Sequence, residues 1–92
     1  MQLSSMSLFA ELLLPVGLEV DRDDVEDGVS EEFQDLVEVT GSGSGVYGAN
    51  LDLEFRSADQ SELVSRLRAV LRALAVKGAK LRFEGATDWI DL

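Results

Sequence analysis

The chain has 92 residues, a formal net charge of -10 and a hydrophobic fraction of 46%. This length fits one domain with one core and excludes a multi-domain enzyme. Because the sequence contains no histidine and no cysteine, it excludes imidazole bases, thiol nucleophiles, disulfides and zinc or haem ligation by these side chains. We expect a single domain over residues 1–92, with residues 1–6 as a leader outside the fold.

The first twenty residues lack the features of an export signal. They contain no Lys or Arg, and their apolar residues are interrupted by Glu11, Pro15 and Gly17. The longest apolar stretch, Leu12–Leu18, is much shorter than the roughly 20 residues that cross a bilayer. We therefore predict a cytoplasmic protein without a membrane-spanning segment. The absence of cysteine agrees with that compartment.

The segment Ser7–Val20 fits two patterns. Every second residue from Leu8 to Val16 is apolar, which is typical of a strand, but a helix would also gather apolar residues on one face. Pro15 cannot continue a helix and disfavours helical angles in the residue before it. The favoured interpretation is a strand that bends at Pro15 and Gly17 and lies at a sheet edge, because proline cannot donate a ladder hydrogen bond.

An acidic segment follows, from Glu19 to Glu38. It holds ten acidic residues and one basic residue, Arg22. Since such a density of charge resists burial, we expect Asp21–Gly28 to be a solvated connection. Ser30 is a suitable N-cap for one or two helical turns, after which Leu36–Thr40 can begin a strand.

The glycine-rich sequence GSGSG, residues 41–45, is typical of a flexible hairpin connection. It leads into a segment with the alternation of a half-buried strand, Val46–Phe55. Tyr47, Leu51 and Leu53 belong to its apolar face, and polar residues occupy the alternate positions.

The strongest helical periodicity runs from Asp59 to Lys77 and ends before Gly78. Lys80–Glu84 alternates again, and the strand, helix and strand predict a βαβ-like unit if the two strands are parallel in one sheet. Thr87–Leu92 completes the chain as a short strand or a lid, with Trp89 closing the core or anchoring an interface.

These elements predict the α+β class. We expect a small, mostly antiparallel sheet with one long amphipathic helix packed on one face. The elements are predicted in the order β-β-β-α-β, with a further short strand at the end.

Two short motifs resemble ligand sites. Gly43, Gly45 and Gly48 match G-x-G-x-x-G, but a strand follows them where a dinucleotide site needs a helix. The segment that begins at Asp23 resembles a calcium loop, but Val25 and Gln34 occupy positions that need oxygen ligands. We therefore predict no cofactor, no metal site and no catalytic residue.

Charge is divided unevenly along the chain, because 13 of the 18 acidic residues and one of the eight basic residues precede residue 56. The acidic segment either keeps the protein soluble or attracts a basic partner. Nucleic acid is not expected to bind, because phosphate repels a molecule of this charge despite Arg66, Arg68 and Arg72. The predicted partner-binding residues are Asp21, Asp23, Asp24, Glu26, Asp27, Glu31 and Glu32, with Asp52 and Glu54 as secondary contacts.

The stretch TGSGSGVYGANLDLEF followed by SELVSRLRAVLRALAVKGAKLRF covers Thr40 to Phe83. It resembles a pattern in small uncharacterised bacterial α+β proteins, some of them immunity-like partners of toxins. In that pattern a glycine-rich turn precedes a strand with a polar row, here Asn50, Asp52 and Glu54. The resemblance implies an interaction role and supplies no catalytic residue.

We therefore predict a non-catalytic, acidic protein-interaction module of the inhibitor or immunity type that docks a basic protein. The alternative is a small structural subunit or a homodimer formed through a sheet edge, in which charge only prevents aggregation.

Overall fold

The computed structural model describes residues 7–17, 20–45, 48–57 and 59–92. Within these residues the order of elements is β1 (Leu8–Leu14), α1 (Arg22–Phe33), the 3₁₀ turn η1 (Gln34–Leu36), β2 (Val37–Gly45), β3 (Gly48–Phe55), α2 (Gln60–Ala73), β4 (Lys80–Phe83) and β5 (Ile90–Asp91). The α+β class is confirmed. The order differs from the predicted one, because a helix separates the first two strands. The predicted leader, residues 1–6, lies outside the described residues.

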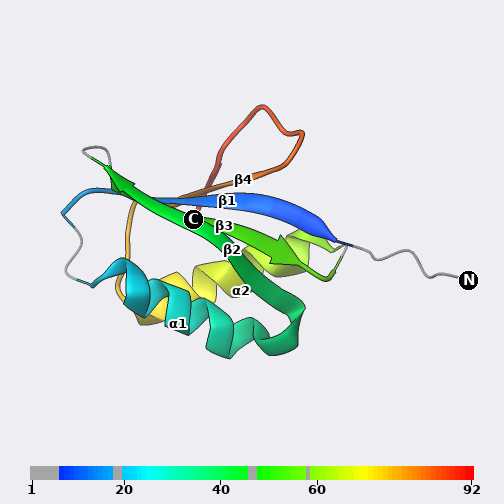
Figure 1. Cartoon of the computed structure of the whole chain (residues 1–92), viewed down its shortest axis with the longest axis horizontal. Helices are drawn as coiled ribbons and strands as arrows, with labels where there is room; N and C mark the ends of the chain where they lie inside the picture. The colour runs from blue at the N-terminus through cyan, green and yellow to red at the C-terminus, as the bar shows by residue number, and fades with distance from the viewer. Residues whose placement is uncertain (1–6, 18–19, 46–47, 58) are drawn as a thin grey trace, which may run out of the picture.

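The five strands form one antiparallel sheet in the order β2-β3-β1-β4-β5. Both helices lie on the same side of this sheet (Figure 1). The prediction that β1 is an edge strand is wrong, because β1 pairs with β3 on one side and β4 on the other. Pro15 follows the last residue of the strand, so β1 keeps every backbone donor it needs for both ladders.

Strands β3 and β4 are both antiparallel to β1 and are therefore parallel to each other, with β1 between them. Helix α2 connects β3 to β4 across that central strand. The predicted βαβ-like unit is thus present in a split form. Its two strands are not neighbours, because β1 lies between them and forms hydrogen bonds with both.

The acidic segment is a helix, and the prediction of a solvated connection over Asp21–Gly28 is wrong. Its apolar residues, Val25, Val29 and Phe33, are spaced by four, so α1 presents one buried stripe to the core. Ser30 is exposed within α1 and does not cap it, because the N-cap is Asp21. Burial of the three apolar side chains stabilises a helix that the acidic composition concealed.

The helical side of the sheet carries two helices that pack against each other, where one long helix was predicted. A Cβ atom at Gly28 of α1 would lie 3.2 Å from side-chain carbons of both Val70 and Leu74. Between α1 and the sheet, the rings of Phe33 and Phe55 meet edge to face with centroids 5.1 Å apart. Glycine at position 28 therefore allows the close approach of α1 to α2.

The GSGSG segment belongs to β2, so its assignment to a hairpin connection is wrong. A register shift between Val39 and Gly41 places Gly41 opposite Asp52, and Gly43 lies opposite Asn50. A Cβ atom at Gly43 would lie 2.9 Å from the side-chain oxygen of Asn50. These glycines give room to polar side chains of β3. The connection and Tyr47 fall on residues 46–47, outside the described residues.

The predicted long helix is confirmed as α2, with shorter bounds. Leu63, Leu67 and Leu71 are buried among the core residues. The helix ends at Ala73, before Gly78, because Ala75 adopts a left-handed φ of 60° and Val76 N–H donates to the carbonyl of Leu71 at 2.8 Å. This arrangement is a Schellman motif with alanine in the position that usually holds glycine.

The connection between β4 and β5 rises on the side of the sheet opposite the helices (Figure 1). Ile90 and Leu92 pack against the core, as predicted for the end of the chain. Trp89 does not close the core. Its half-buried ring instead lies under the guanidinium of Arg82, 4.5 Å from the ring centroid.

Candidate functional site

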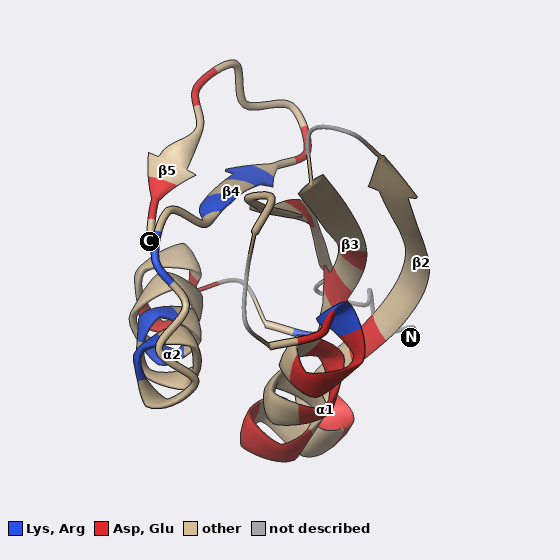
Figure 2. Cartoon of the chain, turned by 90° about the vertical axis from the view of Figure 1, so that its left-hand side faces the viewer, with Lys and Arg blue, Asp and Glu red and all other residues tan. Residues whose placement is uncertain are grey.

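Seven of the nine predicted partner-binding residues lie on or directly before α1. All are exposed except Glu26, which is half-buried. Figure 2 shows their acidic positions gathered along this helix. They face away from the core because the buried stripe is occupied by apolar residues. The seven are Asp21, Asp23, Asp24, Glu26, Asp27, Glu31 and Glu32, which we call the α1 acidic surface.

The first turn of α1 accommodates acidic residues favourably. Asp21 is the N-cap, and its backbone N–H donates to the carboxylate of Asp24 at 3.3 Å. Asp23 and Asp24 also lie where the helix dipole favours negative charge. At the other end, Glu31 and Glu32 lie near the C-terminus, where the same dipole opposes them. The acidic character of α1 therefore continues beyond what its capping needs.

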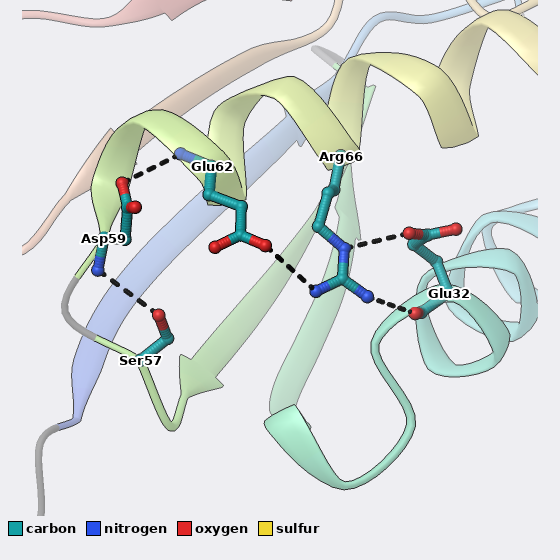
Figure 3. A network of polar contacts seen from close by, with 5 residues as sticks. All are labelled: Glu32, Ser57, Asp59, Glu62 and Arg66. Atoms are coloured by element: carbon teal, nitrogen blue, oxygen red, sulfur yellow. Dashed lines mark hydrogen bonds and ion pairs between the residues drawn. The ribbon is translucent and has the colours of Figure 1, made fainter.

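One member of the α1 acidic surface is tied to α2. The guanidinium of Arg66 donates from Nε to the Glu32 carboxylate at 2.9 Å and from a terminal nitrogen to the Glu32 carbonyl at 2.7 Å (Figure 3). The same guanidinium lies 4.6 Å from the centroid of Phe33. Glu32 therefore acts first as a link between the helices. The remaining members form no ion pair among the described residues.

The two secondary residues, Asp52 and Glu54, lie elsewhere. They alternate with buried residues of β3 and occupy the face of the sheet that the helices leave open. Glu54 accepts a hydrogen bond from the hydroxyl of Ser7 at 3.1 Å, and Asp52 is exposed. The sequence-predicted set is thus divided between two opposite sides of the molecule.

Side chains on the open face form ordered rows across the strands. Glu11 of β1 lies between Asp52 of β3 and Arg82 of β4. The Arg82 guanidinium is 3.4 Å from the Glu11 carboxylate and stacks on Trp89. Opposed like charges such as those of Glu11 and Asp52 destabilise a sheet. The row therefore has one neutralised carboxylate and one that lacks an ion pair within the described residues.

A groove of about 520 Å³ lies over this part of the open face. Its lining includes Phe9, Glu11, Asp52, Arg82 and Glu84, together with Gly85 and Ala86 from the β4–β5 connection. Sequence reasoning missed Phe9, Glu11 and Arg82 as members of a common site. Alternation in β1 and β4 did place each of them opposite a buried face, but only the strand order brings them together.

Catalytic and metal chemistry receive no positive indication from the described residues. No group of three or more Asp or Glu side chains among them is arranged to hold a metal ion. The residues that resembled a calcium loop, from Asp23 onward, lie on a regular helix. Within the same described part of the chain, no helix is both long and apolar enough to cross a membrane.

The order β-α-β-β-α-β, with the strands arranged β2-β3-β1-β4, defines a split βαβ arrangement of the ferredoxin-like kind, extended here by β5 at one edge. No family model and no curated protein matches the sequence. The crystal structure of PH0061 is similar, with a TM-score of 0.50 and 14% identity over 95% of this chain. This chain spans 57% of the length of that protein. At this identity the likeness concerns the fold, and a fold of this kind serves many functions.

Proposed function

We propose that this chain is a non-catalytic, acidic, cytoplasmic protein-interaction module that docks a basic protein through the α1 acidic surface. The observation that carries this proposal is a row of three exposed carboxylates, Asp23, Asp27 and Glu31, spaced one turn apart on α1. None of the three forms an ion pair among the described residues. They offer a cationic partner a row of unneutralised charge.

The energetics of α1 also support docking. Like charges four residues apart on a helix each destabilise it by about 0.2–0.5 kcal/mol. Glu31 and Glu32 lie close to the C-terminal end, and the last turn contains no basic residue. Glu32 pairs with Arg66 and so contributes to the fold, but the structure gives the charge of Glu31 no such role. A basic partner would offset a cost that the isolated domain bears.

The proposed surface is narrower than the sequence suggested. Asp52 and Glu54 lie on the open face, and α1 lies on the other side of the sheet (Figure 1). A partner seated on α1 does not also reach those two residues without wrapping around the sheet. An inhibitor or immunity-type protein that covers a basic surface would use the α1 acidic surface alone.

A comparison of partner binding by the native protein and by variants that lack carboxylate charges tests this proposal. The variant Asp23→Asn, Asp27→Asn, Glu31→Gln removes three charges from α1. The matched variant Glu54→Gln, Glu84→Gln, Asp88→Asn removes three charges elsewhere. The two variants and the native protein are immobilised separately and exposed to a lysate at about 50 and 150 mM salt. Binding that depends on charge should weaken at the higher concentration, because salt screens the attraction.

The proposal predicts a basic protein that the native chain and the matched variant retain and the α1 variant loses. The retained protein should then bind the purified native chain in isolation. If all three proteins retained the basic protein equally, or if both variants lost it equally, the α1 acidic surface would have no specific role in docking.

A second candidate is self-association through β2. This strand has nine residues and pairs only with β3 within the described sheet, so its other edge is free there. A free edge can template a second strand. Sedimentation over a range of concentrations tests this candidate: it expects a dimer that Ser42→Lys abolishes, and a monomer at every concentration would exclude it.

A further inference from the structure

The groove on the open face is separate from the α1 acidic surface. Helix α1 lies on the other side of the sheet (Figure 1). Three strands build its floor. Phe9 and Glu11 come from β1, Asp52 from β3 and Arg82 from β4. Its volume of about 520 Å³ is within the range of sites that hold small molecules.

The groove carries an excess of negative charge. Three carboxylates line it, those of Glu11, Asp52 and Glu84, against the single guanidinium of Arg82. Arg82 is already engaged, since it lies beside Glu11 and stacks on Trp89. Asp52 and Glu84 are exposed and form no ion pair within the described residues. Two carboxylates are therefore available to a ligand cation.

Phe9 adds an apolar surface between these charges. Its side chain is 44% exposed, although Ala10, Leu12 and Leu14 on the other face of β1 are buried. Glu54 lies opposite Phe9 on β3, and on the β4 side the backbone N–H of Glu84 donates to the carbonyl of Phe9 at 2.8 Å. An exposed aromatic ring flanked by carboxylates attracts cations that carry an apolar body.

The rim limits what can enter. Ala86 N–H donates to the carbonyl of Phe83 at 3.0 Å, and Gly85 adopts a φ of 87°, so the chain turns sharply at the end of β4. The connection from this turn to β5 stands above the open face (Figure 1). A flat macromolecular surface would meet the connection before it reached the floor of the groove.

We propose that the groove binds a small organic cation, an ammonium or guanidinium group on an apolar or aromatic body. The cationic group pairs with Asp52 or Glu84, and the apolar body packs on Phe9. Phe9 lies on β1, so its backbone is about 5 Å from the neighbouring strands that lead to Asp52 and Glu84. A ligand of one ring and a short amine chain spans that distance.

The probe is 2-phenylethylammonium, with 2-phenylethanol as the uncharged analogue and phenylacetate as the anionic one. Titration followed by amide NMR should shift Phe9, Glu11, Asp52 and Ala86 with a dissociation constant of about 1 mM or below. Trp89, the single tryptophan, reports the same titration by fluorescence because it lies against Arg82. The two analogues should bind at least about tenfold more weakly.

Matched variants separate a built groove from diffuse attraction. Asp52→Asn and Phe9→Ala should each weaken binding about fivefold to tenfold, because each removes one of the two contacts. Glu31→Gln removes the same charge from α1 and should leave the affinity unchanged. The amide spectrum of each variant verifies its fold.

Three results would overturn the proposal. The first is no saturable shift of the groove amides by 2-phenylethylammonium. The second is a loss of affinity in Glu31→Gln equal to that in Asp52→Asn. The third is binding of 2-phenylethanol as tight as that of the cation. None of these outcomes measures the docking of a basic protein at α1, which the lysate experiment tests separately.

Discussion

Arg66 of α2 joins Glu32 of α1 through both the carboxylate and the carbonyl of that residue, at 2.9 Å and 2.7 Å. It also approaches Glu62 on its own helix, at 3.9 Å (Figure 3). One guanidinium thus fixes the C-terminal end of α1 against α2 and covers the ring of Phe33. Arg66 therefore adds a polar link between the two helices to their apolar packing at Gly28.

Arg66→Ala should lower the free energy of unfolding by about 1.5 kcal/mol. Charge-assisted hydrogen bonds contribute more than neutral ones, but solvent screens this partly exposed pair. Urea unfolding measures the loss. A double-mutant cycle with Glu32→Gln should give a coupling of about 0.5–1 kcal/mol, whereas the pair Arg66 and Glu62 should give less, because that contact is longer and more exposed. A coupling of zero with Glu32 would contradict the link.

The two residues considered as helix caps, Asp59 and Ser30, differ in their structural roles, and their substitutions should differ in effect. Asp59 caps α2, where its side chain accepts from the N–H of Glu62 at 3.1 Å. Asp59→Ala should destabilise the protein by about 1 kcal/mol. Ser30 is exposed inside α1, so Ser30→Ala should be neutral or stabilise by a few tenths of a kcal/mol, about the propensity difference. Thermal unfolding compares the two, and a larger loss for Ser30→Ala would restore its predicted role as a cap.

Gly48 and Gly85 both have positive φ values, 125° and 87°, but differ in their surroundings. A Cβ atom at Gly48 would overlap the carbonyl oxygen of Leu14, whereas nothing lies within 4 Å of one at Gly85. Gly85→Ala should cost about 1–2 kcal/mol of backbone strain. Gly48→Ala should cost clearly more, because the backbones of β1 and β3 must also separate. Equal losses in urea unfolding would show that the close approach is unimportant.

Ala75 occupies the left-handed position at the end of α2, with a φ of 60°. Ala75→Gly should therefore stabilise the protein by about 0.5–1 kcal/mol, because glycine accepts this angle without steric cost. Ala73→Gly, two residues earlier at the last position of the helix, should destabilise by about 0.5–1 kcal/mol. Calorimetric midpoints should move in opposite directions. A decrease in both variants would contradict the Schellman motif.

Sequence patterns determined the elements that carry their own periodicity. The alternation in Val46–Phe55 and Lys80–Glu84 and the repeat that includes Leu63 and Leu67 predicted β3, β4 and α2, because each buries one face independently of its neighbours. The same patterns predicted that the α1 acids would stay exposed. Their role in docking is still a prediction.

Tertiary structure alone decided the rest. Val25, Val29 and Phe33 are too few to indicate a helix within ten acidic residues, and α1 forms because the core buries them. The glycines of β2 are strand residues because Asn50 and Asp52 occupy the space above them. Strand order, which no local pattern encodes, brings Phe9, Glu11, Asp52 and Arg82 to one groove: neighbours in a sheet are selected by burial of the whole core and by backbone pairing across distant segments.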